Sequence, residues 1–333
     1  MIPVCVTGAT GFLGSAVLRR LVAQGVPARA LVRPSERANQ LERCGAEVIR
    51  GDLQDTSAIT RAVAGAEIVY HVAAMVEAPG DLACFLDANR GGTERVFQAA
   101  LQQDVRHIIY TSSIAVYGLA RDGEIIDENT PYDERPELRD AYSQSKIQAD
   151  AFAVSFAQRI TDQVARGQKL SVTILRPGVI YGPGKALPFG LLGFQAGKTS
   201  VIFGKRDNRI PLNYIENLVD AMQLAATHHH EALRQYIVLD DDALTLEQYH
   251  QARKEVQGTH ALFLSSAPVL AAARFAQATC IVPPNADFSA RQVRRALQNR
   301  HYSTQRIRQE LGWQPRVPLR EALRLSLARQ DQP

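Results

Sequence analysis

Two side chains four residues apart, Tyr142 and Lys146 in the segment YSQSK, have the types and spacing for acid–base chemistry. On a helix this spacing places both side chains on one face. The phenol of a free tyrosine has a pKa of ~10, and a neighbouring ammonium group favours the phenolate and lowers that pKa toward the range useful in catalysis. The same pair also occurs between ordinary neighbours on helix surfaces, so its meaning depends on the surrounding elements.

A second pattern lies near the start of the chain, where VTGATGFLGSAV places Gly8, Gly11 and Gly14 between a predicted strand and a predicted helix. In parallel α/β sheets this turn offers unpaired N–H groups and the positive end of a helix dipole to the pyrophosphate of a dinucleotide. The glycines permit a tight turn, a close approach of backbone to phosphate, and packing of helix on strand. The alternative is a tight turn that binds no ligand.

The end of the second predicted strand favours NADP as the cofactor, with NAD as the alternative. At this point an acidic residue accepts a hydrogen bond from the ribose 2′-hydroxyl of NAD, whereas an arginine accommodates the 2′-phosphate of NADP. The segment LVRPSER has Arg33 there, Arg37 one turn later, and no acid at the strand tip. The other interpretation of Arg33 is a solvated surface arginine.

These residues need a framework, and the first half of the chain predicts one in which short apolar runs alternate with segments of helical periodicity. The predicted strands are residues 2–7, 26–33, 46–53, 66–74, 105–113 and 170–177, and the predicted helices include residues 13–23, 91–103 and 142–159. Apolar strands separated by helices are typical of a parallel sheet covered on both faces. The expected fold class is therefore α/β, a doubly wound parallel sheet of the Rossmann type with a smaller C-terminal substrate lobe.

Bulk composition limits the other classes of protein. A chain of 333 residues that is 46% apolar can bury one large core or two moderate ones. The formal charge of +4 is spread along the chain, so we expect no nucleic-acid partner. The 4 cysteines are too few and scattered for a disulfide framework, which favours a reducing compartment and a cytoplasmic location. With no signal-peptide pattern and no run of roughly 18 apolar residues, we expect no membrane span.

Several ordered motifs together resemble the extended short-chain dehydrogenase/reductase family, within the NAD-dependent epimerase/dehydratase superfamily. They are TGATGFLG, GDL, HVAA, TSSIAVYG, YSQSK, RPGVIYGPG and the C-terminal YSTQRIRQELGWQP. The resemblance implies that Tyr142 is the catalytic acid or base, that Lys146 lowers its pKa and holds the nicotinamide ribose, and that Ser113 hydrogen-bonds the reacting oxygen. Ser113 is expected rather than Ser112, because family members place this hydroxyl five residues before the glycine that is Gly118 here.

The resemblance also implies a set of cofactor contacts. Asp52 and Leu53 are expected to flank the adenine, Ala73 and Ala74 to line the path of the pyrophosphate and ribose, and residues 177–179 to back the nicotinamide. The full expected set is Gly8, Thr10, Gly11, Phe12, Leu13, Gly14, Arg33, Asp52, Leu53, Ala73, Ala74, Tyr142, Lys146, Pro177, Gly178 and Val179. Asn89, in the segment NRGGT, matches a family asparagine that is mainly structural.

By the same resemblance the chain divides into two parts. Residues 1–177 plus about 209–240 are expected to form the NAD(P)-binding Rossmann domain, and about 178–208 plus 241–333 the substrate-binding lobe. Family members often dimerise through two helices per subunit, so a homodimer is expected.

Two departures bear on the substrate. Nucleotide-sugar epimerases and dehydratases usually carry an asparagine where this chain has Gly178 and Val179, which argues against a nucleotide sugar. The segment Thr259–Pro284 is longer and more apolar than in those enzymes, and it resembles the 3β-hydroxysteroid dehydrogenase and dihydroflavonol reductase branches. We expect it to form a helix that packs on its own lobe, with a lid over an apolar substrate or a surface for a membrane or partner as the alternatives.

The histidines give no metal site. His71 is expected to be a packing residue, and the run at 228–230 a solvated loop, because no carboxylate or cysteine spacing supports metal ligation there.

Three functions follow for comparison. The first is an NADP-dependent oxidoreductase interconverting a ketone or aldehyde and an alcohol on a small, fairly apolar substrate. The second is a nucleotide-sugar epimerase or dehydratase with tightly held NAD. The third is a non-catalytic cofactor sensor or scaffold, against which the complete serine, tyrosine and lysine set argues.

Overall fold

A computed structural model describes residues 3–76, 81–118, 124–164, 170–185, 193–228, 233–279 and 290–327. Its centre is a seven-stranded sheet in the order β12-β7-β5-β4-β1-β2-β3, with every neighbouring pair parallel. The strands are β1 (Val4–Thr7), β2 (Ala28–Val32), β3 (Glu47–Arg50), β4 (Ile68–His71), β5 (His107–Thr111), β7 (Ser171–Pro177) and β12 (Leu233–Val238). Strands β1, β5 and β7 are buried along their whole length, as expected for a sheet covered on both faces.

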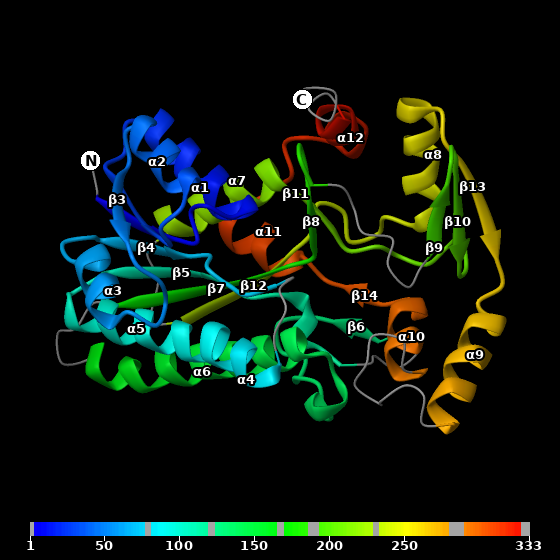
Figure 1. Ribbon diagram of the computed structural model, residues 1–333, viewed down its shortest axis with the longest axis horizontal. Coiled ribbons are helices and arrows are strands. Elements are labelled where there is room, and N and C mark those ends of the chain that lie inside the picture. Colours follow the sequence, from blue (N-terminus) through cyan, green and yellow to red (C-terminus); the bar gives the residue numbers. More distant parts are fainter. Residues whose placement is uncertain are drawn as a thin grey trace.

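Helices cover the sheet on two sides (Figure 1). One face carries α1 (Phe12–Ala23), α2 (Glu36–Arg43), α7 (Ile215–Thr227) and α11 (Gln305–Leu311). The other carries α3 (Thr56–Val63), α4 (Leu82–Phe85), α5 (Gly92–Gln102) and α6 (Ala141–Val164). A π-helical turn, Leu86–Gly91, joins α4 to α5. Each face has its own cluster of buried apolar side chains. The expected doubly wound α/β fold is confirmed.

The remaining elements gather beyond the carboxyl ends of the central strands (Figure 1). They include two short parallel pairs, β8 (Val179–Tyr181) with β11 (Leu212–Tyr214) and β6 (Ile125–Ile126) with β14 (His301–Tyr302). A three-stranded sheet has the order β13-β10-β9, with β9 (Gly193–Ala196), β10 (Thr199–Phe203) and β13 (His260–Leu264). The helices are α8 (Leu246–Gln257), α9 (Ala267–Ala278), α10 (Ala290–Leu297) and α12 (Leu319–Leu327).

The C-terminal segment is fastened to α7 through Asn217, which is fully buried. Its side chain donates to the Val317 carbonyl at 2.9 Å and accepts from the N–H groups of Arg316 and Val317 at 3.1 and 2.9 Å. Its carbonyl accepts from the indole of the buried Trp313 at 3.2 Å. These bonds hold residues 313–317 against the main domain.

Most predicted elements are found, with ends shifted by a few residues. The predicted division into a Rossmann domain and a substrate lobe stays a prediction, although β12 lies at the edge of the central sheet as that division requires. The apolar segment 259–284 differs from a single packing helix, because it begins with strand β13, which pairs in parallel with β10 before α9 follows. Its last residues, from 280 onward, lie outside the described part of the chain, as do His229 and His230.

Candidate active site

Two glycines of the turn, Gly8 and Gly14, allow close backbone packing within the protein. Gly8 has φ +72°, and a Cβ there would lie 2.7 Å from the Cα of Ala73, so the turn and the segment after β4 touch through backbone. A Cβ on Gly14 would lie 2.2 Å from the Gly8 carbonyl oxygen, so this glycine lets α1 pack on the turn. Both therefore serve the fold of the turn.

Gly11 has fewer close neighbours than the other two glycines of the turn. Among the described residues, the only atom within 4 Å of the position a Cβ would take is the Gly8 carbonyl oxygen at 3.2 Å. Gly11 is the N-cap of α1, and the first turn contains no acidic side chain, so its N–H groups are suited to an anion. The position fits a dinucleotide pyrophosphate, as the sequence predicts.

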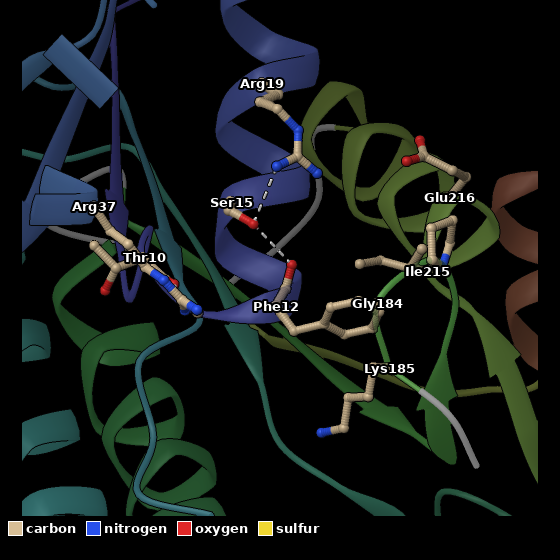
Figure 2. A pocket seen from close by; sticks show the side chains of 11 residues that line it. Thr10, Phe12, Ser15, Arg19, Arg37, Gly184, Lys185, Ile215 and Glu216 are labelled. Carbon is tan, nitrogen blue, oxygen red and sulfur yellow. Dashed lines mark hydrogen bonds between the residues drawn. The ribbon is translucent and has the colours of Figure 1, made fainter. Parts of the chain in front are cut away.

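A cavity of about 530 Å³ opens over this turn. Figure 2 shows Arg37 near Thr10, and Lys185 reaching toward the turn from the far side of Phe12. Arg37 Nη1 donates to the Thr10 carbonyl at 3.4 Å, and the Lys185 ammonium lies 5.8 Å from the centre of the Phe12 ring. Positive side chains on both sides complement a bound phosphate.

The residues expected at the adenine end lie beside the same edge. Arg33 is exposed directly after β2, as an arginine facing a 2′-phosphate must be. The Asp52 carboxylate accepts from the N–H groups of Gln54 and Asp55 at 2.8 and 3.2 Å, which shapes the loop after β3. Leu53 packs against Gly92 of α5, where a Cβ would lie 2.7 Å from it.

The segment after β4, where the cofactor is expected to lie, is fixed by a buried chain of hydrogen bonds. Thr7 Oγ1 accepts from the Ala73 N–H at 3.2 Å and lies 2.8 Å from His71 Nδ1, while His71 Nε2 lies 3.0 Å from Thr93 Oγ1. Burial and the charge of Lys146 lower the pKa of His71 to about 3, so the ring is neutral. His71 is thus a packing and hydrogen-bonding residue, as predicted.

Asn89 has a structural role of the same kind. From the π-helical turn its Oδ1 accepts from the Met75 N–H at 2.6 Å, and its Nδ2 donates to the Met75 carbonyl at 2.9 Å and to Ser145 Oγ at 2.8 Å. These bonds tie the segment after Ala74 to helix α6. Asn89 therefore positions the cofactor path against the helix that carries Tyr142.

Tyr142 and Ser113 are brought together by the structure. Ser113 caps a 3-10 turn, Ile114–Val116, after β5, and its hydroxyl lies close enough to the Tyr142 phenol to act on the pKa of that phenol. Burial raises the pKa of Tyr142, and the Ser113 hydroxyl opposes that rise. Ser112, by contrast, is buried beside the Asp150 carboxylate. The catalytic role of Ser113 rather than Ser112 stays a prediction.

Lys146 follows Tyr142 by one turn of α6 and differs from expectation in one respect. Its ammonium donates to the Thr111 carbonyl at 2.8 Å and to the Tyr110 hydroxyl at 3.2 Å. Burial lowers the pKa of Lys146 to about 8, and the charge of Asp150 opposes that shift. Among the described residues, those that act on the pKa of Tyr142 are Ser113 and Asp140, so the expected lowering by Lys146 is not met in this structure.

A buried ion pair that the sequence analysis missed supports the same residues. Asp150, four residues beyond Lys146 on α6, receives two bonds from Arg176 of β7, at 2.6 Å from Nη2 and 3.0 Å from Nε. Arg176 also donates to the Tyr117 hydroxyl at 2.8 Å and to Gln235 of β12 at 2.6 Å. Burial raises the pKa of Asp150, but the charge of Arg176 outweighs this and keeps that pKa below its usual range. The i, i+4 spacing from Lys146 was the available signal.

Residues 177–179, which are expected to lie behind the nicotinamide, come directly after Arg176 in the sequence. Pro177 ends β7, and the Gly178 N–H donates to Asn213 Oδ1 at 2.7 Å. A Cβ on Gly178 would lie 2.3 Å from the Pro211 carbonyl, so only glycine fits between these strands. Val179, at 37% exposure, presents an apolar side chain at this edge of the sheet.

Comparison with known proteins places these motifs in a family. The model of the NAD dependent epimerase/dehydratase family matches residues 4–238, from β1 through β12. The chain belongs to this family. The expected membership of the extended short-chain dehydrogenases/reductases is thereby confirmed.

Curated relatives of this family member include several reductases. The 2-alkyl-3-oxoalkanoate reductase of Shewanella oneidensis is 30% identical over 72% of this chain, and that of Stenotrophomonas maltophilia is 32% identical over 67%. A 3 beta-hydroxysteroid dehydrogenase/Delta 5-->4-isomerase of Mycobacterium tuberculosis is 30% identical over 68%. The matches span 62%, 64% and 60% of those relatives' own lengths, which is less than two thirds.

Solved structures agree on the fold along the whole chain. The crystal structure of gox2253 has a TM-score of 0.77 at 27% identity, and covers 99% of this chain and 98% of that one. A UDP-glucose 4-epimerase of Thermotoga maritima has a TM-score of 0.71 at 20% identity with the same coverage, which shows a common fold. Within the described residues, no helix is both long and apolar enough to cross a bilayer.

Proposed function

We propose that the chain is an NADP-dependent oxidoreductase that interconverts a ketone or aldehyde and an alcohol on a small, fairly apolar substrate. The observation that carries the proposal is that the Ser113 hydroxyl lies close enough to the Tyr142 phenol to act on its pKa, with the buried Lys146 one helical turn further along α6. Ser113 follows the carboxyl end of β5, at the same edge of the parallel sheet that bears the glycine turn after β1. The reductases among the relatives support the same class of reaction.

In this proposal Ser113 and Tyr142 hold the oxygen of a substrate carbonyl through two hydrogen bonds. Because burial raises its pKa, Tyr142 carries its proton at neutral pH and can donate it to that oxygen. The bound nicotinamide supplies the hydride that reaches the carbonyl carbon. In the reverse direction Tyr142 takes the proton from an alcohol.

Lys146 acts as a binding residue. Two of its three N–H groups go to Thr111 and Tyr110, which fixes the direction of the ammonium and leaves a further donor for a ribose hydroxyl. Its charge also lies close enough to His71 to act on the pKa of that ring, which places it beside the path after β4. The proposed role is therefore to orient the ribose rather than to activate Tyr142 directly.

The NADP preference rests on Arg33 and Arg37, whose positions beyond β2 suit a 2′-phosphate. A cytoplasmic location and a homodimer complete the proposal. Support for a reducing compartment comes from Cys5, Cys44 and Cys84, which are free. The homodimer is tested by mass from light scattering.

Substituting Tyr142→Phe tests the catalytic assignment. It should lower kcat for ketone reduction by a factor of about 10² to 10⁴, because the proton donor is lost, while NADPH binding stays close to wild type. Tyr249→Phe in α8, which also removes a buried tyrosine hydroxyl, serves as the matched control and should retain activity. Full activity of the Tyr142→Phe variant would contradict the assignment of Tyr142 as the proton donor.

The net change in the amount of NADPH distinguishes the proposed reductase from the epimerase or dehydratase alternative. Net oxidation of NADPH with a panel of apolar ketones supports the reductase. Conversion of a nucleotide sugar without net change in NADPH or NADH absorbance would contradict it, because hydride then leaves and returns to one substrate.

A further inference from the structure

Three arginines gather around the carboxylate of Asp133. Arg139 lies in the loop before α6, Arg295 lies on α10, and Arg300 directly precedes β14. Arg139 Nη1 donates to Asp133 Oδ2 at 2.9 Å, and Arg295 Nη1 lies 4.0 Å from the same oxygen. The charge of Arg300 acts on both other guanidinium groups. The cluster thus joins the domain that carries Tyr142 to the predicted substrate lobe.

Arg139 attaches this cluster to the proposed catalytic residues. Its Nη2 donates to the Ala115 carbonyl at 3.0 Å and to the Ser143 hydroxyl at 2.8 Å. Ala115 stands two residues after Ser113, and Ser143 directly follows Tyr142. The cluster is therefore joined through Arg139 to the two segments that carry Ser113 and Tyr142.

Arg295 is buried with fewer partners than its charge requires. The residue is 8% exposed, and among the described residues neither its Nη1 nor the Nη1 of Arg300 has a hydrogen-bond partner. Burial and the charges of Arg300 and Arg139 hold the pKa of Arg295 well below its usual range. Guanidinium groups nevertheless stay protonated in proteins, and an incompletely paired buried charge is costly. An anion within reach of these two groups removes that cost.

Arg176 shows how this chain satisfies an arginine that serves the fold. It is 2% exposed, and its three nitrogens donate to Asp150, Tyr117 and Gln235 at 2.6 to 3.0 Å. Its carboxylate partner is bidentate. Among the described residues, Arg295 Nη1 has no hydrogen-bond partner and lies 4.0 Å from a carboxylate oxygen of Asp133, which distinguishes Arg295 from Arg176.

We propose that Arg295 and Arg300 bind an anionic group of the substrate, and that this group is a carboxylate close to the reacting carbon, as in a 3-oxo or 3-hydroxy acid. The inference rests on the proposed function and narrows its substrate class. A planar carboxylate accepts two parallel N–H bonds from a guanidinium group, which fixes orientation as well as position. The carboxylate is unchanged by the reaction: the hydride leaves C3 of the alcohol for the nicotinamide, and the hydroxyl proton goes to the phenolate form of Tyr142.

A diphosphate presents similar negative oxygens to arginine, so the experiment must separate the two sources. The probes are sodium 3-hydroxydecanoate, its methyl ester, which has the same carbon chain without the charge, and UDP-glucose. Each is added to the full-length protein in NADP⁺, and binding is followed by thermal shift and turnover by NADPH formation.

The acid should bind the wild-type protein about 10- to 100-fold more tightly than the ester, as expected for hydrogen bonds to a charged group. Arg295→Gln should abolish this preference by raising KM for the acid while leaving KM for the ester unchanged. Arg295→Lys should restore part of the preference. Arg294→Gln, which removes the same charge from the exposed side of α10, is the matched control and should behave as wild type.

Equal affinity of the wild type for acid and ester overturns the proposal, as does an equal loss of both probes in Arg295→Gln. Displacement by UDP-glucose that Arg295→Gln abolishes, with acid binding unaffected, overturns it in favour of a diphosphate. If Arg295→Gln does not fold, Arg300→Gln gives the second variant, and the wild-type comparison of acid and ester still decides. Binding of the acid without NADPH formation supports the anion site while contradicting the proposed oxidoreductase activity.

Discussion

Replacing Gly11 with alanine should weaken cofactor binding without unfolding the protein. Gly14→Ala, by contrast, should lower the free energy of unfolding without a direct effect on cofactor binding. The added methyl group at Gly11 meets one atom, the Gly8 carbonyl oxygen at 3.2 Å, so a shift of a few tenths of an ångström relieves it. The loss of a good N-cap, about 0.5 kcal/mol, is offset by a similar loss of unfolded-state entropy. At Gly14 the methyl would lie 2.2 Å from the same carbonyl, and overpacking of this kind costs about 1–3 kcal/mol or more.

The effect on binding follows from where each methyl group points. At Gly11 it enters the space proposed for the pyrophosphate, and losing one charge-assisted hydrogen bond costs about 1.5–3 kcal/mol, or roughly 10- to 150-fold in Kd. Titration calorimetry with NADPH measures this, and apo-protein melting measures the folding effect. Gly65→Ala is the control, because its φ is +70° but no atom lies within 4 Å of the new methyl, so stability alone should fall slightly. Wild-type NADPH affinity in Gly11→Ala would refute the assignment of this turn.

Three further outcomes are expected. Asp150→Asn should lower the free energy of unfolding by about 3–5 kcal/mol, because Arg176 keeps a buried charge without its carboxylate. Glu67→Gln, in an exposed ion pair, should cost less than about 1 kcal/mol in the same denaturant titration. Because a base holds its proton below its pKa, Lys146 is charged below about pH 8 and loses the charge above it, so NADPH affinity should fall above that pH; a flat profile to pH 10 contradicts the ribose role. Arg33→Ala should raise Kd for NADPH about 10-fold and leave NADH unchanged, while an equal loss for both cofactors removes the basis for NADP preference.

The sequence predicted those parts of the molecule that depend on local patterns. A strand–turn–helix unit could be predicted from Gly8, Gly11 and Gly14, because the steric limits on the backbone act within a few residues. The hydroxyl of Ser113 was placed near Tyr142 by family spacing, and the structure brings the two together. The geometry of these motifs depends mainly on the residues within them.

The unpredicted parts depend on contacts between distant segments. Arg176 and Asp150 are 26 residues apart and sit on different elements, so no periodicity couples them. The direction of Lys146 toward Tyr110 and Thr111, rather than toward Tyr142, is set by the packing of α6 on β5. Strand β13 was missed because its alternating exposure becomes meaningful only beside β10.

The clamp that Asn217 forms on residues 313–317, together with the pairing of β6 with β14, has a consequence for biosynthesis. A nascent chain emerges from the ribosome with its N-terminal part first, and that part can begin to fold early. Strand β6 can pair with β14 only after residues 301–302 have been synthesised. Helix α7 can bind residues 313–317 only later still. Proteolysis of ribosome-bound chains should therefore find strands β1 to β5 and the helices between them protected well before β6 and α7.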